Sequence, residues 1–145
     1  MKNSRCENLN PHQLSPLTLA FLGDAVFELF VRERLVRMGS RPSSELHRLS
    51  VQKVCCNAQA KATERLLPAL TEEEAAIFRR GKNAQPKHIP RNASPENYHS
   101  ATALEALFGY LYLCGRPERL KELLTLAVSG GESQKGDGCN AACSE

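Results

Sequence analysis

Apolar side chains recur every three or four positions along most of the chain, and this spacing predicts helices rather than strands. The longest such stretch covers residues 17–38, where the recurring positions are Leu17, Ala20, Phe21, Ala25, Phe27, Val31 and Leu35. Serine followed by proline, a frequent helix start, occurs at residues 15–16 and 94–95. Thr71 and Glu74 have the spacing of a capping box. The pattern predicts an all-α bundle of five or six helices.

Changes in composition divide the chain into three parts. Residues 1–11 are a polar N-terminal segment, and residues 12–128 carry the helical pattern of one folded domain. Residues 129–145 are rich in glycine and polar side chains, which predicts a disordered tail. Inside the domain we expect helices at 17–38, from 43 or 44 to about 67, 71–80, 94–113 and 117–128, with 82–93 as a loop.

The size and composition are those of one soluble domain. The chain has 145 residues, of which 41% are hydrophobic and 24% charged. No apolar run approaches the roughly 18 residues of a membrane span, and the N-terminus lacks a secretory signal, so we expect a cytoplasmic protein without membrane contact. The six cysteines are then expected as reduced thiols. The pair Cys139 and Cys143 lacks the further ligands of a structural zinc site.

Two carboxylates occupy positions where a helical pattern predicts apolar side chains. Asp24 follows Gly23 in the middle of the longest helix, and its neighbours one turn away are mostly apolar. Glu105 is the only charged residue between positions 101 and 113, in a helix that is apolar on nearly all sides. A buried carboxylate must meet a cation, a donor network or a metal ion. Each acid could therefore form a structural salt bridge, or both could hold one Mg²⁺ together with waters and a substrate phosphate.

The positive charge of the chain is concentrated in one segment. Residues 75–95 contain no Asp or Glu but hold five Lys and Arg side chains, while the rest of the chain is slightly acidic. This segment leads into the helix that carries Glu105, so it is a candidate for binding a polyanion. The alternative is a solvated loop without a binding role. The loop at 82–93 lacks Phe, Tyr and Trp side chains for stacking single-stranded bases, which favours binding to the backbone of a duplex.

At this point the chain resembles a known family. The sequence Leu-Ala-Phe-Leu-Gly-Asp-Ala-Val at residues 19–26 resembles the signature helix of ribonuclease III, and Thr-Ala-Leu-Glu-Ala-Leu-Phe-Gly at 102–109 resembles its second acidic helix. The short length without a double-stranded-RNA-binding domain, Arg-Gly-Lys-Asn-Ala at 80–84 and Gly-Tyr-Leu-Tyr-Leu at 109–113 are similar to Mini-ribonuclease III. The resemblance covers about residues 12–128.

The resemblance implies a homodimeric, Mg²⁺-dependent endoribonuclease that cuts double-stranded RNA and matures the ends of the 23S ribosomal RNA precursor. It implies that Asp24 and Glu105 are the catalytic and metal-binding residues. It places Phe21 at the dimer interface, although an intrachain core explains the apolar pattern around Phe21 and Ala25 equally well. The residues it implicates in RNA binding are Arg79, Arg80, Lys82, Asn83, Lys87 and Arg91.

Two positions depart from the larger ribonuclease III enzymes. These have an acid four residues before the aspartate and an aspartate three residues before the glutamate, whereas this chain has Ala20 and Thr102. We therefore expect one well-held ion, with Glu28 either in its outer shell or in a surface ion pair. Two other functions remain open: a catalytically silent module that binds structured RNA, and an all-α nucleotide pyrophosphohydrolase, for which the expected clusters of acids are lacking.

Overall fold

The part of the chain that the structure describes folds as a bundle of six α-helices. The computed structural model describes residues 9–85, 88–89, 91–92 and 94–131. The helices are α1 (Pro16–Arg37), α2 (Ser43–Val54), α3 (Cys56–Leu66), α4 (Glu72–Lys82), α5 (Pro95–Leu113) and α6 (Pro117–Val128). Three short 3₁₀ helices accompany them: η1 (Pro11–Gln13), η2 (Leu67–Ala69) and η3 (Ser129–Gly131). These described residues contain no strand, which confirms the predicted all-α class.

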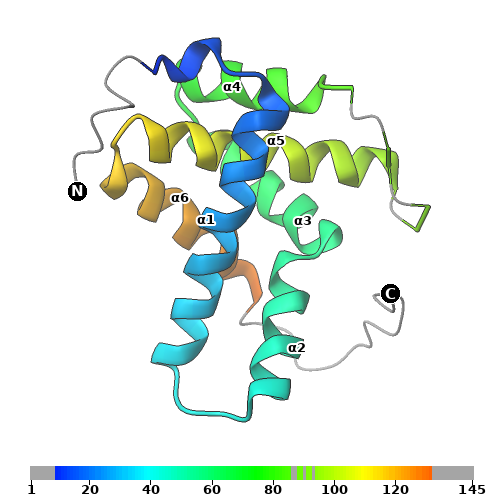
Figure 1. Cartoon of the computed structure of the whole chain (residues 1–145), viewed down its shortest axis with the longest axis vertical. Helices are drawn as coiled ribbons and strands as arrows, with labels where there is room; N and C mark the ends of the chain where they lie inside the picture. The colour runs from blue at the N-terminus through cyan, green and yellow to red at the C-terminus, as the bar shows by residue number, and fades with distance from the viewer. Residues whose placement is uncertain (1–8, 86–87, 90, 93, 132–145) are drawn as a thin grey trace.

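The central element of the bundle is α5. Nearly every side chain from Ser100 to Leu111 is buried, and α1, α3, α4 and α6 all pack against this helix. Figure 1 shows α1 crossing α5 at a steep angle, with α4 on one side of α5 and α2 beside the far half of α1. The crossing joins the two helices that carry Asp24 and Glu105.

Two glycines allow α1 and α5 to approach this closely. A Cβ atom at Gly23 would lie 1.6 Å from the backbone oxygen of Glu105, and one at Gly109 would lie 2.0 Å from the backbone oxygen of Leu19. Any larger residue would force the helices apart at these positions. Gly23 therefore has a packing role that offsets its low helix propensity, and this role fixes the helix backbone beside Glu105.

Two of the predicted helix caps form in the structure, whereas Ser94 at the start of α5 makes no capping hydrogen bond. Ser15 caps α1 by accepting a hydrogen bond from the Thr18 amide at 3.1 Å. The capping box of α4 is complete, because Thr71 accepts from the Glu74 amide and the Glu74 side chain accepts from the Thr71 amide. None of the helices in the described ranges is both long and apolar enough to cross a lipid bilayer.

The prediction of one helix from residue 43 to about 67 is wrong. The chain breaks at Cys55, which has an extended conformation with φ −66° and ψ 156°, and α2 and α3 are separate helices. The Val54 carbonyl at the break accepts a hydrogen bond from the side-chain amide of Gln59 at 2.9 Å. A side chain therefore satisfies a carbonyl at the end of α2 that a continuous helix would have bonded to backbone.

Candidate active site at the crossing of α1 and α5

Asp24 and Glu105 come together where α1 crosses α5. Gly23, which precedes Asp24, faces the Glu105 backbone, and the negative charge of Asp24 is close enough to raise the pKa of Glu105. The two acids are 81 positions apart in sequence. The sequence hypothesis that the two helices cross and bring both carboxylates to one place therefore agrees with the geometry.

Glu105 is partly buried, and no cationic side chain of the described chain pairs with it. Its Oε1 accepts a hydrogen bond from Nε2 of Gln59 at 3.1 Å. Burial raises the pKa of Glu105 to about 7, the Gln59 hydrogen bond opposes this rise, and Asp24 adds to it. The described residues therefore form no salt bridge with Glu105. A bound cation would stabilise the charged form of its carboxyl group.

Asp24 lies at the protein surface, contrary to the expectation that its neighbours bury it. Ala20 and Phe27 turn into the core, but Phe21, one turn before Asp24, is exposed. Asp24 lies at the border between these faces, where a ligand can reach it. Partial burial and the nearby charge of Glu28 raise the pKa of its carboxyl.

Glu28 forms an ion pair of its own with Arg32, one turn later on α1, at 2.5 Å. This is the surface ion pair that the sequence left as one of two alternatives. The charge of Glu28 still acts on Asp24. Asp24, Glu28 and Glu105 therefore form a locally negative region in which Arg32 is the one cation paired with an acid among the residues that the structure describes.

Two carboxylates of the described chain, Asp24 and Glu105, are of the type that could serve as ligands of a Mg²⁺ ion. No group of three or more His, Cys, Asp or Glu side chains with metal-binding geometry occurs in the described residues. Mg²⁺ commonly keeps several waters and takes only one or two carboxylates together with phosphate oxygens. Asp24 and Glu105, which lack a cationic partner in the described chain, match that donor set.

Gln59 is a residue of the site that sequence analysis missed. It lies on α3 with 3% of its surface exposed and reaches Glu105, 46 positions later. Its only sequence signal is a polar residue at a position that helical spacing from Ala62 and Leu66 places on the inner face. Thr102, at the position of the missing aspartate, bonds instead to the Tyr98 carbonyl at 3.0 Å.

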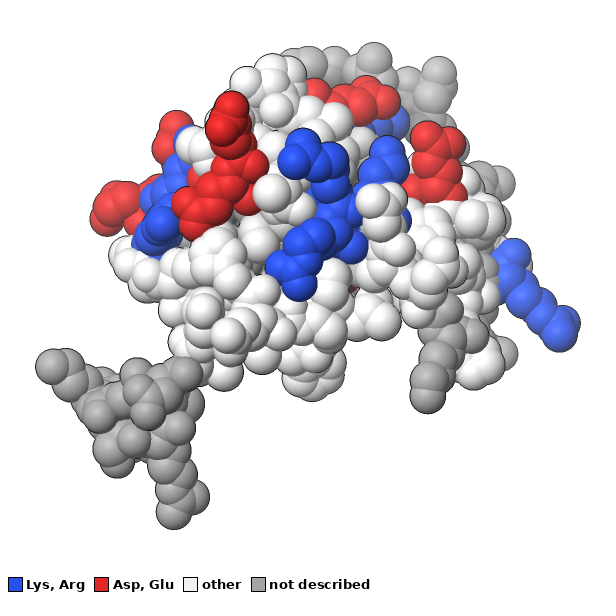
Figure 2. Space-filling view, turned by 90° about the horizontal axis from the view of Figure 1, so that it is seen from above, with Lys and Arg blue, Asp and Glu red and all other residues white. Residues whose placement is uncertain are grey.

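The predicted RNA-binding residues divide into two groups. Arg79, Lys82 and Asn83 are exposed at the end of α4, and Arg91 is exposed in the following loop. Arg80 has a structural contact, since its guanidinium donates to the backbone oxygens of residues 12 and 14 at 3.2 and 3.1 Å. Lys87 lies outside the described residues. Figure 2 shows a group of basic side chains on the end of the molecule where α4 and η1 lie, with acidic side chains beside it.

Phe21 is not part of the core of its own chain. It is 86% exposed, and Leu17 and Leu29 on the same helix are 40% and 68% exposed. The apolar pattern at Phe21 and Ala25 therefore belongs to an open face of α1 rather than to an intrachain core. Large exposed apolar side chains that adjoin one another are typical of protein interfaces.

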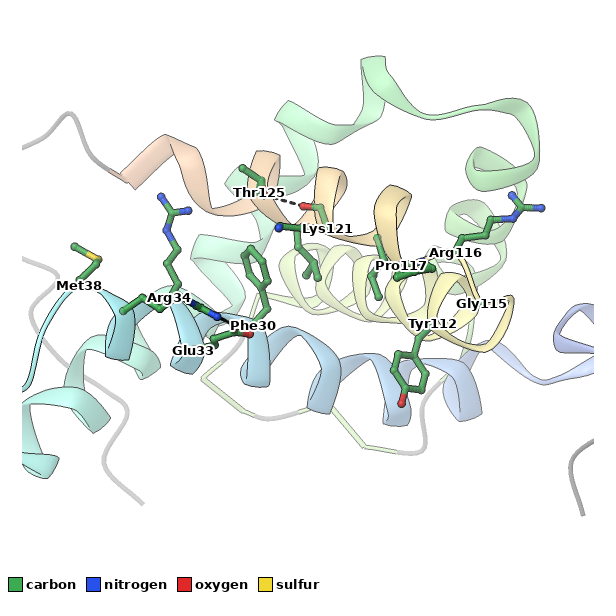
Figure 3. Close-up of a pocket in the computed structure, with 13 residues that line it drawn as sticks. Phe30, Glu33, Arg34, Met38, Tyr112, Gly115, Arg116, Pro117, Lys121 and Thr125 are labelled. Atoms are coloured by element: carbon green, nitrogen blue, oxygen red, sulfur yellow. Dashed lines mark hydrogen bonds and ion pairs between the residues drawn. The ribbon is translucent and has the colours of Figure 1, made fainter. Parts of the chain in front are cut away.

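A groove of about 1130 Å³ lies away from these residues, between the second half of α1 and α6 (Figure 3). Phe30 and Leu120 line it together with the basic side chains Arg37 and Lys121. Arg37 pairs with Glu33 at 2.7 Å. Neither Asp24 nor Glu105 lines this groove, so it is separate from the candidate site.

Comparison with known proteins identifies the family. Residues 17–116 match the Ribonuclease III domain family, a span that includes Asp24 and Glu105. The chain belongs to the ribonuclease III family. Proteins named Mini-ribonuclease 3 from Symbiobacterium thermophilum and Brevibacillus brevis are 50% and 41% identical to it. The alignments cover 82% and 86% of this chain and 92% and 94% of those proteins. These relatives place the chain in the Mini-ribonuclease 3 branch, as predicted from sequence.

A crystal structure of a Fusobacterium nucleatum protein shares this ribonuclease III fold. It is 34% identical to the chain, with a TM-score of 0.74, and the match covers 81% of this chain and 94% of that one. The family and the relatives' names make the chain an endoribonuclease of the ribonuclease III type. They favour this activity over a silent RNA-binding module and over a nucleotide pyrophosphohydrolase.

Proposed function

We propose that this ribonuclease III family member hydrolyses phosphodiester bonds in double-stranded RNA, using Mg²⁺ held by Asp24 and Glu105. The observation that carries the proposal is the Glu105 carboxylate. It is partly buried beside Asp24 with a pKa raised to about 7, and no side chain of the described residues neutralises it. A divalent cation would supply the missing positive charge, and two carboxylates match the ligands of Mg²⁺.

The residues of the site would hold the metal ion and position the RNA duplex. Asp24 and Glu105 would hold the ion between α1 and α5, on backbone fixed by the Gly23 contact. Mg²⁺ bound there would supply Lewis-acid chemistry, stabilising negative charge on the scissile phosphate and making an attacking water more acidic. The exposed Arg79, Lys82 and Arg91 would bind phosphates of an A-form duplex, whose deep groove offers side chains little base information. Asn83 would donate hydrogen bonds there, and Lys87 and Arg80 complete the proposed set.

The exposed apolar face of α1 supports a homodimer. Two copies related by a two-fold axis would bury Phe21 and would present two active sites to the two strands of a duplex. The substitution Phe21→Asp should shift the protein toward monomer in sedimentation velocity, whereas Leu67→Asp, at a half-exposed site on η2, should not. A wild-type monomer at micromolar concentration would contradict the dimer.

The proposed natural substrate is the 23S ribosomal RNA precursor, in the cytoplasm. The support is the resemblance of residues 80–84 and 109–113 to Mini-ribonuclease III, together with the relatives of that name. A long stem of such a precursor is a duplex that a single small domain could recognise by shape. Two cuts across its strands would release both ends together.

The proposal is tested by incubating the protein with an end-labelled RNA duplex in Mg²⁺ and in excess chelator. Wild type should cut only in Mg²⁺, and Asp24→Asn should bind the duplex in a mobility-shift assay without cutting it. Glu33→Gln is the matched control, because Glu33 is a surface acid on the same helix that pairs with Arg37. Cutting by Asp24→Asn at the wild-type rate would refute the site, and cutting in chelator would refute the metal.

A further inference from the structure

Gln59 has an unusual hydrogen-bonding arrangement for a buried amide. Its side chain is enclosed between α3 and α5, with 3% of the residue exposed. Its Nε2 donates to the Val54 carbonyl at 2.9 Å and to Oε1 of Glu105 at 3.1 Å. Both hydrogens of the amide are therefore used. Because both partners are acceptors, the amide must point its nitrogen toward them.

This arrangement holds one oxygen of Glu105 and leaves the other available. Oε1 accepts from Gln59, whereas Oε2 has no hydrogen bond to any residue that the structure describes. The Val54 contact holds the Gln59 amide in turn, because it ties the amide to the end of α2. Glu105 is therefore oriented by a chain of contacts from α2 through α3 to α5.

The oxygen of the same amide is also notable. Oε1 of Gln59 is buried and finds no hydrogen-bond donor in the described part of the chain. Buried carbonyl oxygens are nearly always bonded to protein or to ordered water. This acceptor belongs to the amide that bonds Glu105, so it lies close to the Glu105 carboxylate.

We propose that Gln59 is a positioning residue for the divalent ion, acting through Glu105. Its amide nitrogen fixes the Glu105 carboxylate with one oxygen free for the ion, and its amide oxygen accepts a hydrogen bond from water at the site. This inference rests on the proposed Mg²⁺ site and assigns it a second layer of contacts. Groups that orient a metal ligand in this way commonly contribute tenfold or more to metal affinity.

The competing explanation is that Gln59 only ties α2 to α3 through Val54. The substitution Gln59→Met tests the two explanations, because methionine keeps the unbranched length but removes donor and acceptor. Thr63→Val is the matched control. Thr63 is one turn later on α3 and is 6% exposed, and its hydroxyl donates to the Gln59 backbone oxygen at 3.0 Å.

The measurement is Mn²⁺ affinity by isothermal titration calorimetry on the full chain without RNA, at a temperature where circular dichroism shows each variant folded. We expect Gln59→Met to bind Mn²⁺ at least about tenfold more weakly than wild type, and Thr63→Val to bind as wild type does. In the Glu105→Ala background, Gln59→Met should cause no further loss, because its effect passes through Glu105.

Two results would overturn the inference. One is wild-type Mn²⁺ affinity in folded Gln59→Met. The other is an equal loss of affinity with and without Glu105, which would show a general structural effect. The outcome is separable from the proposed function. Duplex cleavage by wild type with unchanged affinity in Gln59→Met rejects only the role of Gln59. A tenfold loss of affinity in a protein that cuts no duplex rejects only the proposed function.

Discussion

Two glutamates of this protein, the buried Glu74 and the partly buried Glu105, have opposite environments. Glu74 is 1% exposed and accepts hydrogen bonds from Nε and Nη2 of Arg119, each at 2.8 Å, and from the Thr71 amide at 2.9 Å. The Arg119 hydrogen bonds hold the pKa of Glu74 below its usual value. Glu105 has one hydrogen bond, from Gln59, and its pKa rises to about 7.

The contrast separates a structural acid from a functional one. At Glu74 the fold supplies the compensating charge, so the carboxylate contributes to stability only as part of a complete network. At Glu105 no cation in the described chain compensates the charge, so ionisation costs stability that a ligand can restore. Among the described residues, Glu74 thus has a cationic partner and Glu105 has none, although both are glutamates of the same bundle.

The largest effect that we expect is on catalysis at Glu105. Glu105→Gln keeps the shape and removes the charge, so RNA cleavage in Mg²⁺ should fall by about a thousandfold or more, since a bound ion contributes several kcal/mol to the transition state. Single-turnover cleavage of a labelled duplex measures this. The unfolding free energy in chelator should be equal to or above that of wild type, because a poorly compensated charge is gone. A marked loss of stability would instead give Glu105 a structural role like that of Glu74.

The next effect concerns the stability that Glu74 provides. Glu74→Ala leaves Arg119 without its main partner, and we expect the unfolding free energy to fall by about 3 kcal/mol in urea denaturation. The value is at the lower end for a buried pair because 23% of the Arg119 side chain is exposed. Glu64→Ala, at an exposed site on α3, is the control. RNA cleavage per folded molecule should stay at the wild-type level. A loss of cleavage in molecules that remain folded would show that Glu74 has more than a structural role.

Sequence reasoning predicted most of the helices and singled out both candidate acids because these signals are local or nearly so, but it joined α2 and α3 into one helix. Caps, apolar spacing and a lone charge in an apolar helix are visible within a few residues. Gln59 was missed because its role depends on a contact across 46 positions. The spacing of Phe21 could not decide between the core of its own chain and an exposed face, because apolar side chains recur with the same period in both. Whether an acid is paired, as Glu74 is, also depends on tertiary contacts that no local pattern records.

The smallest effect is a pH dependence of stability that should differ between the two acids. The pKa of Glu105 rises from 4.5 to about 7 on folding, so between these values the folded state keeps a proton that the unfolded state releases. Stability therefore falls as pH rises through this window. The lowered pKa of Glu74 acts oppositely, with stability lost as pH falls below 4.5. We therefore compare the unfolding free energies of Glu105→Gln and wild type in chelator by urea denaturation. The excess stability of the variant over wild type should grow by roughly 2 kcal/mol between pH 4.5 and 7.5. Saturating Mg²⁺ should reduce this pH dependence, because the ion stabilises the charged form of Glu105. A stability difference between variant and wild type that does not change with pH would show that the protein itself already compensates the charge of Glu105.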